Sequence, residues 1–247
     1  MEVEDVSDVF KKVIDNNYVA LRVNGIFIKE QLIERIRKVS YHKCSQEFIQ
    51  KVEEAEKQCF PLLGIQIRSK NSRRIWLSQV EGIANIINHL YADYPKLGIL
   101  FDGWSITGKE DESSSCWSTI DADKATMDDI VALIPGHIPV YSAIGATTFE
   151  TATWWTQSIE LGITPLSGGM IYSSWIGNKV SLVHAPSLNI SYFHNQVTTS
   201  DFRENLNPSI TIPTEYVTDI PNSDNYEVDW KYVYDELVKV LAMVHQN

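Results

Sequence analysis

Residues 61–102, PLLGIQIRSKNSRRIWLSQVEGIANIINHLYADYPKLGILFD, contain the pattern that decides the fold. The short apolar runs at 61–68 and 96–102 are typical of buried strands, and residues 75–94 between them have the length of a helix. A strand, a helix and a second strand in this order usually form a right-handed unit with parallel strands. The stretch therefore predicts an α/β protein.

The same alternation continues towards the C-terminus. Further strands are expected at 137–144, 162–166 and 179–184, and helices at 126–134, 149–159, 170–176 and 229–245. Residues 108–115 have the composition of an exposed loop, and residues 189–225 are polar and irregular. This series predicts a doubly wound, mainly parallel Rossmann-like sheet with helices on both faces.

The N-terminal part has a different rhythm and predicts a small α+β segment over residues 1–58. Residues 19–28 are β-rich and contain Asn24-Gly25, which suits a hairpin turn. Helices are expected at 29–39 and 45–58, the second with Ser45 as its N-cap. The Rossmann-like domain would then cover residues 59–247.

The bulk composition excludes several classes of protein. The chain has 247 residues and a net charge of −11, which argues against a broad phosphate-binding surface for nucleic acid. No apolar run is long enough for a transmembrane helix, and the acidic start MEVED lacks the pattern of a secretory signal. The three cysteines form no CxxC pair. We therefore expect a cytoplasmic protein with reduced thiols.

One strand end carries a cluster of the chain's basic residues. Four of them follow the first predicted strand within seven positions, namely Arg68, Lys70, Arg73 and Arg74, whereas residues 75–164 hold 12 acidic and 3 basic residues. A guanidinium offers paired donors that match phosphate oxygens. The loop is thus either a solvated basic loop or a site for a small anion such as a diphosphate.

Three other strand ends carry candidate binding groups, because ligands of open parallel sheets bind at the carboxyl ends of strands. Ser167, Gly168 and Gly169 form a turn that lets a ligand approach the backbone closely. Small residues around Gly145 and Thr147 leave room for a flat ring. Asp102 could accept from a sugar hydroxyl, act as a base, or cap the following turn. Plain turn chemistry remains an alternative for each.

Several catalytic motifs are missing from the sequence. It contains no GxGxxG, HExxH or GxSxG pattern, which disfavours a Rossmann-type oxidoreductase, a zinc protease and an esterase-type serine hydrolase. Asp121 and Asp123 have DxD spacing, but they lie in a polar stretch where both charges are expected to be exposed. We therefore predict no protein-held metal.

Taken in order, these strand ends resemble the C-terminal, donor-binding domain of GT-B glycosyltransferases. GIQIRSKNSRR is similar to the arginine-bearing strand end of fucosyltransferase-like members, and ITPLSGGMIYSSWIGNKVSLVH resembles the late block with its Gly-rich turn. The likeness covers about residues 60–187. GT-B enzymes have two Rossmann-like domains and are longer than this chain, and no clear counterpart of the donor-sugar glutamate precedes Gly168.

The resemblance implies transfer of a sugar from a nucleotide-sugar to a hydroxyl acceptor in glycan or polysaccharide synthesis, without metal or other cofactor. Asp102 would then be an acceptor-side base. The substrate-binding residues would be Arg68, Arg73, Arg74, Gly145, Thr147, Ser167, Gly168 and Gly169. Other domains of a larger enzyme would be partners. The alternative is a non-catalytic α/β module that binds glycan or protein.

Overall fold

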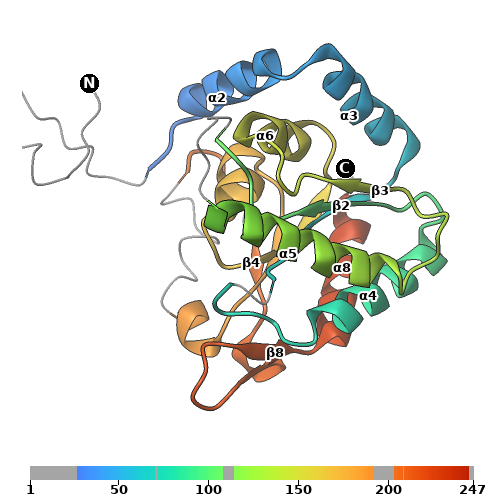
Figure 1. The fold of residues 1–247 in the computed structure, drawn as a ribbon, viewed down its shortest axis with the longest axis vertical. Coiled ribbons are helices and arrows are strands. Elements are labelled where there is room, and N and C mark those ends of the chain that lie inside the picture. The colour runs from blue at the N-terminus through green and yellow to red at the C-terminus, as the bar shows by residue number, and fades with distance from the viewer. Residues whose placement is uncertain (1–26, 70–71, 108–113, 192–202, 208, 245–247) are drawn as a thin grey trace, which may run out of the picture.

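A six-stranded parallel sheet forms the centre of the protein. The computed structural model describes residues 27–69, 72–107, 114–191, 203–207 and 209–244. The sheet has the strand order β3-β2-β1-β4-β5-β6 (Figure 1). Its strands are β1 (Leu62–Gln66), β2 (Gly98–Asp102), β3 (Val140–Ser142), β4 (Leu161–Pro165), β5 (Ser181–His184) and β6 (Ile210–Thr211). The strand order reverses between β1 and β4, so the predicted doubly wound Rossmann-like sheet is confirmed.

Helices cover both faces of this sheet. On one face, α4 packs against α5 and α8, and on the other face α6 packs against α2, α3 and the short π-helix η1. Their bounds are α2 (Glu30–Lys43), α3 (Gln46–Gln58), α4 (Gln79–Asp93), α5 (Ser114–Val131), α6 (Thr148–Gln157), η1 (Ile171–Ile176) and α8 (Trp230–Val244). None of these described helices is long and apolar enough to cross a membrane.

Side chains along each strand point alternately to the two faces of the sheet, which explains why helices cover both faces. In β1, Leu63 and Ile65 join the apolar cluster of α4, α5 and α8, whereas Leu62 joins the cluster of α3 and α6. Successive side chains of a strand point to opposite faces, so strands that are apolar throughout need helices on both sides. This is why the continuous apolar runs of the sequence become central parallel strands.

The structure corrects two expectations about secondary structure. Helix α5 begins at Ser114, twelve residues before the expected start, because Cys116 and Ile120 bury one face of a helix that is otherwise polar. The stretch expected to be irregular, residues 189–225, contains β6, the 3₁₀ turn η2 (Thr214–Tyr216) and β7 (Val217–Asp219), which pairs antiparallel with β8 (Tyr226–Val228) just beyond it. These strands are too short to produce a visible apolar alternation.

The N-terminal segment is described from residue 27 onward, so most of the expected hairpin at 19–28 lies outside the described residues. Helix α3 begins after Ser45, whose hydroxyl accepts from the amide of Phe48 at 3.2 Å, as its predicted N-cap role requires. Both α2 and α3 pack on α6. The division of the chain after residue 58 stays a prediction.

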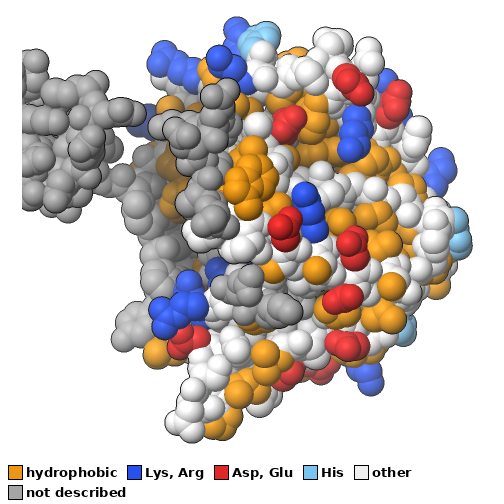
Figure 2. Space-filling view, viewed as in Figure 1, with side chains coloured by type: hydrophobic (Ala, Val, Ile, Leu, Met, Phe, Trp, Pro, Cys, Tyr) orange, Lys and Arg blue, Asp and Glu red, His pale blue; other side chains and the backbone are white. Residues whose placement is uncertain are grey.

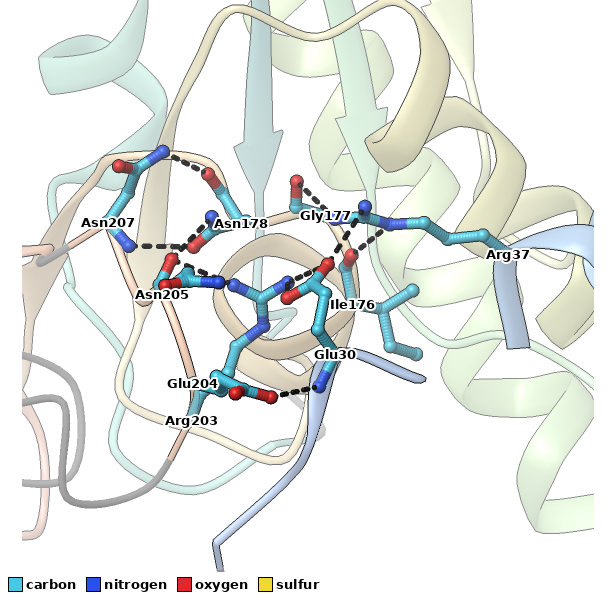
Figure 3. A network of polar contacts seen from close by, with 9 residues as sticks. All are labelled: Glu30, Arg37, Ile176, Gly177, Asn178, Arg203, Glu204, Asn205 and Asn207. Atoms are coloured by element: carbon cyan, nitrogen blue, oxygen red, sulfur yellow. Dashed lines mark hydrogen bonds and ion pairs between the residues drawn. The ribbon is translucent and has the colours of Figure 1, made fainter. Parts of the chain in front are cut away.

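A polar network attaches the start of α2 to the rest of the protein (Figure 3). The fully buried Arg203 forms an ion pair with Glu30 at 2.9 Å, and Glu30 also contacts Arg37 at 3.5 Å. Arg37 in turn donates to the carbonyl oxygen of Ile176 at 2.8 Å, at the end of η1. Neighbouring bonds join Asn178 to Asn207, just before β5 and β6. The network therefore lies at the amino-terminal edge of these strands.

We expect Glu30→Gln to lower the free energy of unfolding by about 2–3 kcal/mol, because it leaves the buried Arg203 guanidinium without a negative partner. Glu34→Gln, which neutralises an exposed carboxylate on the same helix, should change it by less than about 0.5 kcal/mol. Urea unfolding followed by circular dichroism measures both. Equal effects of the two substitutions would contradict the proposed anchoring role.

A close contact between α6 and the two central strands determines how tightly this face packs. The buried indole of Trp155 lies over Gly64 in β1 and Gly162 in β4. A Cβ atom on Gly64 would stand 2.6 Å from the Trp155 ring, and one on Gly162 would stand 2.9 Å from it. Glycine is therefore required at both positions, because any larger residue would overlap the ring.

Gly64→Ala is expected to destabilise the protein by about 1–3 kcal/mol, since the added methyl group would force the Trp155 ring or the strand to move. Gly136→Ala is the matched control, because nothing lies within 4 Å of its added Cβ. The midpoints of urea unfolding give the comparison. A Gly64→Ala protein as stable as the control would show that the contact is not a constraint.

Candidate functional site

A cavity of about 560 Å³ opens at the carboxyl ends of β1, β2 and β4. This is the point at which the strand order reverses, where doubly wound sheets bind their ligands. Its lining comes from the loops after the three strands, from α5 and from η1. The lining residues are Gln66, Ile67, Arg68, Ser72, Arg73, Arg74, Gly103, Trp104, Ser105, Thr119, Asp123, Pro165, Ser167, Gly168, Gly169 and Tyr172.

Six of the predicted site residues lie together in this lining. The basic loop contributes Arg68, Arg73 and Arg74, and the small-residue turn contributes Ser167, Gly168 and Gly169. These two stretches are about a hundred residues apart in the sequence. Because β1 and β4 are neighbours in the sheet, their carboxyl ends bring the two loops into the lining of one cavity.

Two other predicted binding residues lie outside that lining. Gly145 has a left-handed φ of 76°, and its amide donates to the carbonyl oxygen of Trp104 at 2.8 Å. Thr147 caps α6 through a capping box with Glu150, whose carboxylate accepts from the Thr147 hydroxyl at 2.9 Å. Their present contacts are structural, and a binding role for either one stays a prediction.

The arginines of the loop differ in their surroundings. Arg68 is half-buried and donates through Nη1 to the carbonyl oxygen of Arg73 at 2.6 Å, and its burial lowers the pKa of the guanidinium. Arg74 is half-buried in a left-handed conformation, with φ of 57°. Neither makes an ion pair with a carboxylate in the described part of the chain. Arg73 is 87% exposed and pairs with Asp224 at 3.2 Å.

Asp123 holds two of the cavity loops and corrects the expectation that its charge is exposed. It is 3% exposed, and its two carboxylate oxygens accept from the backbone amides of Ser69 at 3.1 Å and Trp104 at 2.9 Å. A Cβ on Gly103 would stand 2.8 Å from the same carboxylate. The sequence prediction missed this position, although the helical spacing of Asp123 after Cys116 and Ile120, both buried, is a signal that could have found it.

The Ser167-Gly168-Gly169 turn uses most of its polar groups internally. The Ser167 hydroxyl accepts from the amide of Gly169 at 3.1 Å, and the amides of Met170 and Ile171 donate back to the turn's carbonyl oxygens. No described residue accepts from the amide of Gly168. The turn therefore offers a backbone donor and the open space around Gly168 to a ligand.

Asp102 lies beneath the cavity and does not line it. Its side chain is 1% exposed, and its Oδ2 accepts from the side-chain amide of Gln66 at 3.0 Å and from the indole nitrogen of Trp155 at 2.8 Å. Burial raises the pKa of Asp102 to about 6, although these hydrogen bonds oppose the shift. The predicted role as an acceptor-side base stays a prediction, while the contacts support a positioning role.

A second buried pair lies behind the arginines. Nδ1 of His184, at the end of β5, forms a hydrogen bond with the hydroxyl of Tyr226 at 2.8 Å. Burial and the nearby Arg68 lower the pKa of His184 to about 3, so its imidazole is neutral. Gln66 and His184 carried no motif in the sequence, and Asp123 was noted only for its DxD spacing with Asp121. Within the described ranges, no group of three His, Cys, Asp or Glu side chains could hold a metal ion.

On the face that Figure 2 shows, charged side chains of both signs are mixed. Figure 2 shows the face that α5 crosses, where acidic, basic and apolar side chains are interspersed rather than grouped into one basic surface. On a protein with a net charge of −11, the unpaired guanidinium groups of the cavity are a local exception. The site therefore suits a small anionic ligand.

The stability of the protein should depend on the ionisation of Asp102. Because its pKa is higher in the folded state than in the unfolded state, the folded protein binds this proton more tightly. The resulting stabilisation is present below about pH 4 and is lost as the pH rises through about 6. As the pH rises from about 4 to above 6, we expect the free energy of unfolding of Asp102→Asn to increase by about 2–3 kcal/mol relative to that of the wild type. Urea unfolding at several pH values tests this, and a constant difference would contradict it.

Comparisons with known proteins identify the fold. No protein-family model matches the chain, and no curated protein sequence matches it. The α,α-trehalose-6-phosphate synthase of Burkholderia multivorans aligns with a TM-score of 0.50 at 11% identity, over 85% of this chain and 41% of that one. The UDP-forming synthase of Burkholderia xenovorans aligns with a TM-score of 0.49 at 10% identity, over 85% and 43% of the two chains.

An E. coli trehalose-6-phosphate synthase bound with UDP-2-fluoro glucose aligns with a TM-score of 0.47 at 12% identity, over 85% and 42% of the two chains. The chain thus spans about two fifths of the length of these structures. At such low identity the likeness concerns the fold. This chain has the fold of the C-terminal Rossmann-like domain of GT-B glycosyltransferases.

Proposed function

We propose that this chain binds the diphosphate of a nucleotide-sugar in the cavity and acts as the donor-binding domain of a glycosyltransferase that transfers the sugar to a hydroxyl acceptor. One observation carries the proposal. The guanidinium groups of Arg68 and Arg74 are half-buried beside a cavity at the switch point of the sheet, and no described carboxylate pairs with either.

The physical reason is the strength of charge interactions at a partly buried site. Removing a cation from water is unfavourable unless an anion or several acceptors replace the solvent. The two loop carbonyl oxygens bound by Arg68 replace the solvent only in part. A diphosphate would supply the missing acceptors, because its oxygens can accept two parallel hydrogen bonds from one guanidinium group.

The size and the rim of the cavity fit the rest of such a ligand. A volume of about 560 Å³ lies within the usual range for small-molecule sites, roughly 300–1,000 Å³. Trp104 lines the cavity while 51% of its surface is exposed, so its indole offers a face on which a base or sugar ring can stack. Gly168, also in the lining, allows the ligand to approach the backbone, because nothing lies within 4 Å of its added Cβ.

In the proposed reaction, the arginines act mainly on the leaving group. When the bond between the sugar and the diphosphate breaks, negative charge grows on the diphosphate, and fixed guanidinium groups stabilise it without reorganising. The acceptor hydroxyl must also lose its proton. Asp123 is the sole carboxylate among the described lining residues, and backbone amides occupy both of its oxygens.

The acceptor site and its base are therefore assigned to other domains of a larger enzyme. The span of about two fifths of the neighbouring structures supports this part of the proposal.

The hydrogen-bonded carboxylate of Asp123 favours a second candidate function, in which the chain is a non-catalytic module that binds glycan or protein through Trp104 and its surroundings. Such a module would bind its partner without any nucleotide.

We expect nucleotide-sugars from a panel of UDP-, GDP- and ADP-sugars to raise the melting temperature by several degrees, because a ligand at 100 times its Kd stabilises by about 2.7 kcal/mol. Arg68→Met and Arg74→Asn should each weaken binding at least about tenfold. Asparagine suits position 74 because it tolerates the left-handed backbone there.

Lys239→Gln is the matched control, since it removes one exposed positive charge from α8, outside the cavity lining. Thermal-shift measurements followed by calorimetric titration give the affinities. The absence of a shift with every nucleotide would reject the proposal, and glycan binding without nucleotide would favour the non-catalytic module.

A further inference from the structure

Gln66 is a cavity residue whose orientation is determined by its neighbours. It ends β1 and is 6% exposed. Its side-chain nitrogen Nε2 lies 3.0 Å from Oδ2 of Asp102 and 2.9 Å from the carbonyl oxygen of Gly169. A carbonyl oxygen can only accept, as can an ionised carboxylate, so the amide must turn its NH₂ group to this side.

The other end of the amide is left without a partner. Oε1 of Gln66 is buried, and none of the described residues donates a hydrogen bond to it. A buried acceptor without a donor is unfavourable, so such an atom in a native site calls for a specific partner. For a residue that lines a cavity, that partner can be a donor group of the ligand.

The amide cannot easily rotate away from this orientation. Asp102 is itself held by the indole nitrogen of Trp155 at 2.8 Å, and the Trp155 ring is wedged against Gly64. On the other side, the backbone of Gly169 lies so close to the amide that an added Cβ would stand 2.9 Å from both Nε2 and Oε1. The acceptor is thus pre-organised before any ligand binds.

We infer that Oε1 of Gln66 accepts a hydrogen bond from a hydroxyl group of the ligand, next to the diphosphate, and thereby selects ligands that carry this hydroxyl. The inference rests on the proposed nucleotide-sugar site. Gln66 lies between the phosphate-binding Arg68, two residues further along, and the turn at Gly169. Sugar hydroxyls flank a nucleotide-sugar diphosphate on both sides, one set on the ribose and one on the transferred sugar.

The test compares matched ligands that differ in one hydroxyl. UDP and 2′-deoxy-UDP, with GDP and 2′-deoxy-GDP, report on the ribose, whereas UDP-glucose and UDP-2-fluoro glucose report on the transferred sugar, because fluorine donates no hydrogen bond. For the wild type, we expect at least one pair to differ about tenfold in Kd by calorimetry, with the hydroxylated member tighter. The pair that differs identifies the source of the hydroxyl.

Gln66→Met removes the amide at similar side-chain length and should reduce that ratio to about one, mainly by weakening the hydroxylated ligand. Gln66→Asn retracts the amide by one methylene, carries the same expectation and replaces the first variant if that one does not fold. Thr164→Val is the control. It removes a different buried polar group, a hydroxyl without a described partner on the neighbouring strand β4, and Thr164 is not among the lining residues of the cavity. It should keep the wild-type ratio.

Two results would overturn the inference: a wild type that binds both members of every pair equally, or a folded Gln66 variant that keeps the wild-type ratio. Failure of the wild type to bind any of these nucleotides has a different meaning, since it rejects the nucleotide site itself and this inference with it. Binding without discrimination rejects only the role of Gln66.

Discussion

The indole of Trp155 lies across the two central strands, and the geometry of the cavity depends on this contact. It fits there because β1 and β4 each carry a glycine beneath the ring. The same indole donates to Asp102, which holds the amide of Gln66, which in turn holds the carbonyl oxygen of Gly169. One packing interaction in the core is therefore connected through three hydrogen bonds to the wall of the candidate site.

The cavity is lined by more basic than acidic side chains, whereas the whole protein is acidic. The chain is acidic, yet half-buried arginines line the cavity, and both oxygens of Asp123, the one carboxylate among the described lining residues, accept from backbone amides. Asp102, the other nearby carboxylate, is buried and has a raised pKa. No described carboxylate forms an ion pair with Arg68 or Arg74, so their guanidinium groups make the field in the cavity favourable for an anionic ligand.

Much of the fold could be predicted because its signals are local. Apolar runs, helical spacing and the N-cap at Ser45 each need only a few neighbouring residues, and they placed most elements of the sheet within a few positions. The site was predictable in part, since the rule on strand ends led to Arg68 and to Ser167–Gly169. Asp123 and the early start of α5 were missed because polar residues on one helix face obscured its buried side.

By itself, the sequence determined the order of strands β1 to β5 and of the helices between them, the acidic balance of the chain and the basic loop after β1, since each is a property of consecutive residues. Only the tertiary structure decided that this loop and the glycine turn share one cavity, that Gly145 and Thr147 lie outside it, and that Asp102 is buried beneath it. The reason is that strand order is settled by packing: once β1 and β4 become neighbours, residues a hundred positions apart meet, and the burial of each side chain follows.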